Sequence, residues 1–235
     1  MKINNLRFTF NKTDTPFFDN LNATFSTGKL TFIQGKNGIG KSTLFAILQG
    51  IQPKECCLSG TLTLDETSYD LNKPHDFYRH VRTVQQDNKR MIAPHFSFYQ
   101  NLQLAQLPER PGLQSLKIPQ IFATMLDHGN IDMTTPAHLL SGGQRQILAI
   151  MMALQKPTRV LLLDEPTAAL DNDNAQQVMA FLENITAELN LITLIICHDK
   201  ELVVTYGHHS CYELVHHNGI RTFSPSLTTI KERYA

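Results

Sequence analysis

A glycine-rich loop at residues 35–43 carries side chains that suit the binding of nucleotide phosphates. Its sequence, GKNGIGKST, matches the phosphate-loop pattern G-x-x-x-x-G-K-[ST]. The glycines let the backbone turn tightly and point successive N–H groups inward, so that the loop can surround an anion. Lys41 would reach the β- and γ-phosphates, and the Ser42 hydroxyl would bind Mg²⁺. The alternative is a glycine-rich turn that binds nothing. If the loop does bind a nucleotide, the residues expected to contact it are Gly35, Asn37, Gly38, Gly40, Lys41, Ser42 and Thr43.

Two carboxylates follow a continuous apolar run. Residues 160–163, VLLL, are typical of a central parallel strand that is buried on both faces, and the run ends at Asp164 and Glu165. Open α/β folds bind their ligands at the carboxyl edge of the sheet, so we expect both carboxylates at that edge. Asp164 could then hold Mg²⁺ together with Ser42, and Glu165 could accept a proton from an attacking water molecule.

Two further polar side chains follow predicted strands. Gln86 comes after the strand at 81–84, and His198 comes after the apolar stretch at 191–197. The same topological argument brings them to the edge that holds Lys41. Both could orient the attacking water and the γ-phosphate, and Gln86 is also a candidate ligand of Mg²⁺. His198 could instead be a purely structural residue.

A second anion site is predicted at Ser141, Gly142, Gly143 and Gln144. Ser141 is a natural N-cap for a helix expected at 145–154, and the N-terminus of a helix attracts anions. Phe10 ends an alternating first strand and lies where the chain could fold over the phosphate loop. The ring of Phe10 could stack on adenine, or it could simply pack in the core.

The elements that must position these residues alternate between buried strands and helices, which predicts an α/β nucleotide-binding core. The opening is mostly β, and a helix face is marked at 178–185. Prolines separate short helical stretches between residues 88 and 140, among them an amphipathic pattern at 118–126. A terminal hairpin with an Asn218-Gly219 turn and a final helix at 226–234 follow. We therefore predict a single domain at 1–235, with a core at 1–86 and 156–235 and an inserted helical subdomain at 87–155.

Composition excludes some classes of function. Lys+Arg and Asp+Glu both number 21, so no global positive charge recruits nucleic acid. The longest nearly apolar run is far shorter than the roughly 20 residues that cross a bilayer, and the N-terminus lacks an apolar signal region. The four cysteines show no zinc-like spacing. We expect a protein of the cytoplasm with no nucleic acid partner.

Together these motifs make the chain resemble the ATP-binding cassette (ABC) family, the ATPase subunits of ABC transporters, over nearly its whole length. The signature motif LSGGQ separates this family from other phosphate-loop ATPases. The matching motifs are Walker A at Gly35 to Thr43, the Q-loop at Gln86, the signature at Leu140 to Gln144, Walker B at Val160 to Glu165 with its catalytic glutamate, the D-loop at Ala169-Leu170-Asp171, and the switch histidine His198.

The resemblance implies a phosphate-loop core with a β subdomain, and a head-to-tail pair of subunits. In that pair ATP lies between Lys41 of one copy and residues 141–144 of the second copy, with Asp171 near the nucleotide. Phe10 would be the A-loop aromatic, where tyrosine is usual, and an alanine stands in the D-loop where serine is frequent. The partner would be a transmembrane permease, which would hold the subunit peripherally on the inner face of the cell membrane.

The motifs look like those of small bacterial uptake systems, including ones for amino acids. An ATP-dependent dimerisation switch that regulates a membrane protein without transport is the alternative. A DNA-repair or ribosome-acting ATPase is disfavoured, because the chain has one cassette, no coiled-coil heptads and no basic stripe. The permease is expected to dock on residues 87–104, with the side chains of Phe96, Phe98, Tyr99 and Leu102 lining a groove, although these side chains could simply pack inside the helical subdomain.

Overall fold

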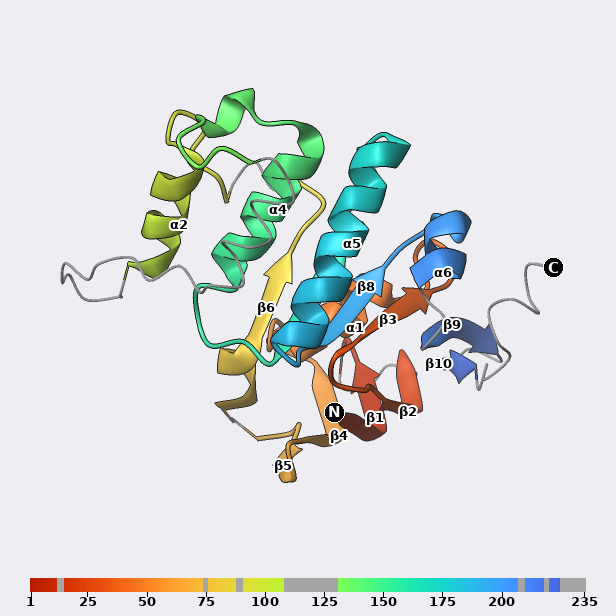
Figure 1. Cartoon of the computed structure of the whole chain (residues 1–235). Coiled ribbons are helices and arrows are strands. Elements are labelled where there is room, and N and C mark those ends of the chain that lie inside the picture. The colour runs from red at the N-terminus through yellow and green to blue at the C-terminus, as the bar shows by residue number, and fades with distance from the viewer. Residues whose placement is uncertain are drawn as a thin grey trace.

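The computed structural model describes residues 1–11, 15–73, 76–87, 91–107, 131–206, 210–217 and 220–224. Within these residues the strands form a ten-stranded sheet in the order β5-β4-β1-β2-β10-β9-β3-β8-β7-β6 (Figure 1). The neighbours β3, β8, β7 and β6 are parallel, whereas β5, β4, β1 and β2 are antiparallel. The predicted α/β fold class and the β-rich opening are confirmed. The strands are β1 (Lys2–Thr9), β2 (Phe18–Thr24), β3 (Lys29–Gln34), β4 (Cys57–Leu64), β5 (Thr67–Asp70), β6 (Val81–Val84), β7 (Val160–Asp164), β8 (Ile192–Ile196), β9 (Cys211–His217) and β10 (Ile220–Ser224).

Helices cover the parallel part of the sheet, and α2 lies beside α4 away from the terminal hairpin of β9 and β10 (Figure 1). Among the residues that the structure describes, none of the helices has both the length and the apolar character that crossing a membrane requires. The α-helices are α1 (Lys41–Leu48), α2 (Phe98–Gln106), α4 (Gly142–Ala153), α5 (Asn172–Glu188) and α6 (Lys200–Tyr206), and the short 3-10 helices are η1 (Asp76–His80) and η3 (Ala137–Leu139).

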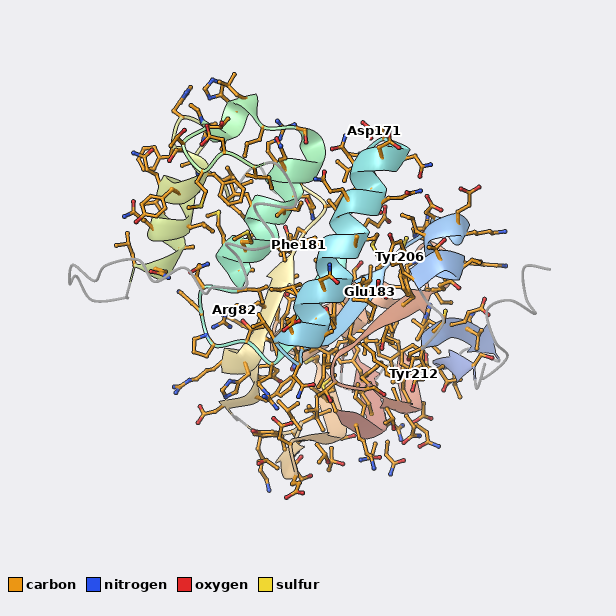
Figure 2. All side chains as sticks on the ribbon, in the orientation of Figure 1. Arg82, Asp171, Phe181, Glu183, Tyr206 and Tyr212 are labelled. Carbon is orange, nitrogen blue, oxygen red and sulfur yellow. The ribbon has the colours of Figure 1, made fainter. Side chains whose placement is uncertain are left out.

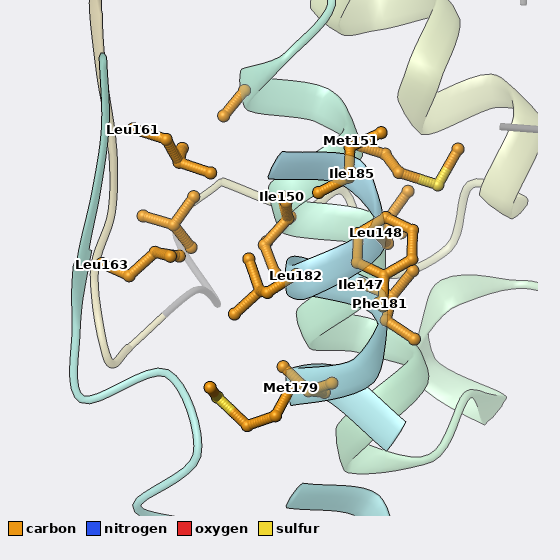
Figure 3. Packing of buried hydrophobic residues seen from close by; sticks show 14 of the residues in the cluster. Ile147, Leu148, Ile150, Met151, Leu161, Leu163, Met179, Phe181, Leu182 and Ile185 are labelled. Atoms are coloured by element: carbon orange, nitrogen blue, oxygen red, sulfur yellow. The ribbon is translucent and has the colours of Figure 1, made fainter. Parts of the chain in front are cut away.

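Strand β7 is buried on both faces, as its sequence predicts. It pairs in parallel with β8 on one side and with β6 on the other. Leu161 and Leu163 pack with buried residues of α4 and α5, which Figure 3 shows, whereas Val160 and Leu162 pack in the cluster that contains α1. Since helices cover both faces, every interior position of this strand favours an apolar side chain. The strand ends at Asp164, on the edge where α1 begins.

The helical region between β6 and β7 is held together by two N-caps and a buried amide. Ser97 and Ser141 each form a capping box with a glutamine three residues later, at the starts of α2 and α4. The buried Asn101 accepts a hydrogen bond from Ala93 N (2.8 Å) and donates to three backbone oxygens of residues 93–97. These bonds hold residues 93–97 against the first turn of α2.

Several sequence predictions need correction. The helix expected at 145–154 begins at Gly142, because the Ser141 cap opens it three residues earlier. Phe10 lies beyond the end of β1 and is 40% exposed. Phe98 and Leu102 do not line a groove, because both are fully buried in the core that α2 forms with α4. The amphipathic pattern at 118–126, the 218–219 turn and the final helix at 226–234 lie outside the described residues.

Candidate functional site

A pocket of about 330 Å³ lies where β7 and β8 end and α1 begins. Its walls come from the phosphate loop and the start of α1 on one side, and from the residues that end or follow the two strands on the other. The pocket therefore brings together most of the predicted nucleotide and catalytic residues, although they are far apart in the sequence. The lining residues are Asn37, Gly38, Gly40, Lys41, Ser42, Thr43, Asp164, Glu165, Ile196 and His198.

Lys41 is the first residue of α1 and is 7% exposed. Its ammonium group donates hydrogen bonds to the carbonyl oxygens of Gly35 (2.8 Å) and Lys36 (3.2 Å), so the loop itself holds the side chain. Gly40 precedes it with φ of 118°, a conformation that strongly favours glycine. Burial lowers the pKa of Lys41, while the negative charges of Glu165 and Asp164 oppose that shift.

Asp164 and Glu165 face the phosphate loop because of the register between β7 and β8. Asp164 pairs with Ile196, and the backbone N–H of Glu165 donates to the carbonyl of Ile196 at 3.0 Å. Glu165 has φ of 50°, in the left-handed region that non-glycine residues seldom adopt. Burial, and then the charge of Glu165, raises the pKa of Asp164, while Lys41 and His198 lower it. Both carboxylates line the pocket at the end of one strand.

His198 follows β8 and lies beside Glu165. The distance between His198 Nε2 and Glu165 Oε1 is 3.4 Å, and both side chains are partly exposed to the pocket. Such a pair allows the imidazole to hold the carboxylate, or a water molecule beside it, in place. The left-handed turn at Glu165 and the lining residue Ile196 were missed by the sequence prediction, since both depend on the pairing of two strands.

Eight predicted residues stand outside this pocket: Gly35, Gln86 and Phe10, and also residues 141–144 and Asp171, which are described below. Gly35 contributes its carbonyl to Lys41 but does not line the wall. Gln86 is exposed after the end of β6 and is not a lining residue. Phe10 packs edge-on against Phe8 and Phe17, with ring centroids 5.0 and 4.9 Å apart. The ring of Phe17 in turn lies against Gly40, where an added Cβ would be 2.6 Å from it. The aromatic cluster therefore reaches the phosphate loop from the side.

The second predicted anion site forms a separate surface at the start of α4. Ser141 Oγ accepts from Gln144 N at 3.1 Å, and Gln144 Oε1 accepts from Ser141 N at 3.0 Å. The cap leaves the first backbone N–H groups, those of Gly142 and Gly143, without a hydrogen bond to the described residues. None of these residues lines the pocket around Lys41. The two predicted anion sites therefore lie apart in a single chain.

Asp171 caps α5 rather than entering the pocket. Its carboxylate accepts from Asn174 N at 2.8 Å, and these hydrogen bonds to Asn174 lower the pKa of Asp171. Figure 2 shows Asp171 at the start of α5. The D-loop aspartate therefore has a structural partner in its own chain.

The chain is similar to ATP-binding proteins of transport systems. A family model described as "ABC transporter" matches residues 18–168. The tyrosine transport ATP-binding protein of Clostridioides difficile is 33% identical over 198 residues, which are 81% of this chain and 77% of that protein. The methionine import ATP-binding protein MetN of Corynebacterium efficiens is 30% identical, over 97% of this chain but only 64% of that protein.

One solved structure is similar along almost the whole chain. It is the structure of cbiO1 from Clostridium perfringens, described as part of the ABC transporter complex cbiONQ. Its TM-score is 0.73 at 27% sequence identity, and the match covers 99% of this chain and 89% of that one. The similarity thus extends beyond the residues that the family model matches.

Proposed function

The chain belongs to the ABC transporter family, as an ATP-binding subunit that hydrolyses ATP, and we propose that two copies bind two ATP molecules head to tail and power a membrane permease for a small solute. The observation that carries the proposal is the pocket in which the phosphate loop faces Glu165 and His198. Water beside Glu165 would lose its proton to that carboxylate as it attacks the γ-phosphate.

Each side chain of the pocket has a definable task in this reaction. The Lys41 ammonium, released from the two carbonyls it now binds, would neutralise charge on the β- and γ-phosphates. His198, 3.4 Å from Glu165, would hold the attacking water and the γ-phosphate in line. Glu165 would take the proton of the water. These three roles follow from the side chains and their positions around one pocket.

The donor set fits Mg²⁺. Magnesium in nucleotide sites is held by one or two carboxylates together with phosphate oxygens, not by a complete protein cage. Consistent with this, no group of three or more His, Cys, Asp or Glu side chains that could hold a metal ion occurs among the described residues. Asp164 and the Ser42 hydroxyl would hold the ion, with Gln86 as a third candidate that would have to approach. The ion would neutralise negative charge that develops on the phosphates.

The head-to-tail arrangement explains the two separate anion groups. The N–H groups of Gly142 and Gly143 and the Ser141 hydroxyl would meet the ATP that Lys41 of a second copy holds. Asp171, close to Ser141, would lie at the junction of the two copies. Phe10, which is partly exposed beside the phosphate loop, would stack on the adenine.

The docking surface for the permease is proposed to be a groove of about 1,030 Å³. It lies between the start of β6 and the ends of α2 and α4, and Met91, from the segment 87–104 predicted to dock, is one of its walls. This groove replaces the one predicted around Phe98 and Leu102. It opens onto the segment 87–155 that we propose as the helical subdomain. Its lining residues are Arg79, His80, Arg82, Met91, Ala105, Met152, Ala153, Lys156 and Pro157.

The solute is proposed to be an amino acid, because similar proteins are named for tyrosine transport and methionine import. The subunit would then lie on the inner face of the membrane, bound through its permease. The docking groove described above includes arginine and lysine side chains, so it also suits an acidic segment of the permease.

The test is to copurify the chain with its membrane partner, reconstitute the complex in vesicles, and measure ATP-driven uptake of labelled amino acids. We expect uptake with the wild-type subunit and a loss of ATP turnover of about 10²- to 10⁴-fold with Glu165→Gln, which keeps the shape of the side chain but cannot accept a proton. Glu201→Gln, in the first turn of α6, is the matched control. ATP hydrolysis without uptake of any solute would favour the dimerisation switch.

A further inference from the structure

A hydrogen-bonded cluster joins the start of α4 to the start of α5, and Asn174 is at its centre. Its Nδ2 donates to both carboxylate oxygens of Asp171, at 2.9 and 2.7 Å. Its Oδ1 accepts the Ser141 hydroxyl at 3.1 Å. Because a carboxylate can only accept, the amide nitrogen must face Asp171, which leaves the amide oxygen for Ser141. The sequence prediction named Ser141 and Asp171 but not the residue that links them.

The bond to Asn174 fixes the direction of the Ser141 hydroxyl. The hydroxyl has one hydrogen, which points to Asn174, while its oxygen accepts the N–H of Gln144. The side chain of Ser141 is therefore held in one rotamer by two partners from two different helices. Without Asn174 only the bond within α4 would remain.

Asn174 also lies directly against the first turn of α4. An added Cβ on Gly143 would be 2.7 Å from Asn174 Oδ1 and 3.1 Å from its Cβ. These distances mean that the backbone of Gly143, whose N–H is a candidate phosphate donor, lies directly beside the Asn174 side chain. Asn174 thus touches the start of α4 at a side chain and at the backbone.

We propose that Asn174 is a positioning residue for ATP hydrolysis, which holds the Ser141 hydroxyl and the first turn of α4 at a fixed place relative to Asp171. This inference rests on the proposed function, in which Ser141 and Gly143 of one copy bind the ATP held by Lys41 of the other. Asn174 acts through Ser141 and has no contact with the pocket around Lys41. It therefore influences turnover and leaves binding of ATP to the single subunit unchanged.

The first experiment compares Asn174→Ala with Asn172→Ala in the full chain. The alanine at 174 keeps the backbone N–H that Asp171 caps, so α5 still begins normally. Asn172 is exposed, and no side-chain hydrogen bond joins it to the rest of the described structure. We expect kcat to fall about threefold to tenfold in Asn174→Ala, the scale of a lost hydrogen bond, with no fall in Asn172→Ala. The affinity of the single subunit for ATP should match wild type in both.

The second experiment separates positioning from a general loss of stability. Asn174→Ala is combined with Ser141→Ala, and ATP turnover is compared across the cycle of four proteins. If Asn174 acts through Ser141, the change at 174 lowers turnover by a smaller factor once the hydroxyl is gone. If Asn174→Ala fails to fold, Asn174→Ser, which keeps a polar group at the helix start, replaces it in the same cycle.

Two results would overturn the role of Asn174 alone, namely a kcat of Asn174→Ala equal to wild type, or an equal loss in the Ser141→Ala background. A different result would overturn the proposed function itself. If Ser141→Ala hydrolyses ATP at the wild-type rate, the shared site between two copies is wrong, and the role of Asn174 is wrong with it.

Discussion

Lys41 is a buried cation whose hydrogen-bond partners in this structure are carbonyl oxygens of its own loop. A phosphate oxygen is a stronger partner for an ammonium group than a neutral carbonyl. We therefore expect Lys41→Ala to weaken ATP binding by about tenfold to a hundredfold, the scale of a charged hydrogen bond. Titration calorimetry on the single subunit measures this, with Lys36→Ala, an exposed lysine of the same loop, as the control. Equal affinities of the two variants would refute the phosphate-binding role.

Asp164 shows how the site lowers the stability of the fold. Burial and Glu165 raise its pKa, so the folded chain binds this proton more tightly than the unfolded chain does. The pKa of an aspartate in an unfolded chain is about 3.9. The contribution of Asp164 to stability therefore falls as pH rises from that pKa through the raised pKa of the folded state, and at pH 7 the charged carboxylate lowers stability. Asp164→Asn should raise the Tm at pH 7 by only about 1–2 °C, because Asp164 is half-buried and water screens part of the penalty.

Calorimetry at pH 7.5 and at about pH 4.5 tests this prediction, because the gain should shrink toward acid as Asp164 becomes protonated in the folded state. Asp173→Asn is the control. Asp173 lies in the first turn of α5, where a negative charge is favourable, so its replacement should leave the Tm unchanged or lower it. A Tm of Asp164→Asn below wild type at pH 7.5 would show that the carboxylate stabilises the fold.

At the residue scale, the phosphate-loop motif, the apolar run before Asp164 and the topology of a parallel sheet were enough to predict that Lys41, Asp164 and Glu165 lie around one pocket. The motif could not predict the left-handed turn at Glu165, because that turn depends on how β7 pairs with β8. Asn174 was invisible for a similar reason, since its partners Ser141 and Asp171 lie on two elements that only the fold brings together.

At the element scale, α4 begins with two glycines whose surroundings differ. An added Cβ on Gly142 would meet Leu170 Cδ2 at 2.8 Å, the flexible end of a side chain, whereas one on Gly143 would meet Asn174, which three further hydrogen bonds to Asp171 hold in place. Alanine is favoured over glycine in a helix by about 1 kcal/mol. Gly142→Ala should therefore be neutral or slightly stabilising, while overpacking of about 1–3 kcal/mol should make Gly143→Ala destabilising by about 1 kcal/mol.

Denaturant unfolding of both variants measures this difference, and an equal midpoint for the two would mean that Asn174 yields as easily as Leu170 does. The comparison has an internal control, because the two changes add the same methyl group one residue apart in the same helix. The two variants differ only in the side chain that the new methyl group meets, which is Leu170 before α5 in one and Asn174 in α5 in the other.

Elements with a continuous apolar run or a clear helical period were predicted well, whereas the buried face of α2 was not. Strand β7 and helix α5 follow the first rule. In α2 the buried face is Phe98, Asn101 and Leu102, and the polar Asn101 hides the helical spacing that would have revealed it. Phe98 was therefore assigned to a surface groove, although it belongs to the core.

At the scale of the whole molecule, one chain carries a phosphate loop and a helix start predicted to bind anions, and the two do not share a pocket. From the sequence, both groups and the single sheet that supports the loop could be predicted. The proposed docking groove could not, because its residues come from η1, β6, α2, α4 and the loops beside them and have no common pattern along the chain. A site shared between two copies of the chain would bring the two predicted anion sites together.

Mixing two inactive variants tests that arrangement directly. Lys41→Ala removes the loop cation from one copy, and Ser141→Arg places a bulky cation at the helix start of the other. In a mixed pair, the intact Lys41 of the Ser141→Arg copy faces the intact Ser141 of the Lys41→Ala copy, so one complete site forms beside one doubly damaged site.

Random pairing makes about half of the dimers mixed with one working site each, so about a quarter of wild-type turnover should return. Turnover is measured on each variant alone and on the mixture at equal total concentration. Crosslinking must show that the mixture contains mixed dimers. If turnover then does not recover, either each copy hydrolyses ATP with residues of its own or both sites of a dimer must be complete. A mixture of wild type with either variant distinguishes these two explanations.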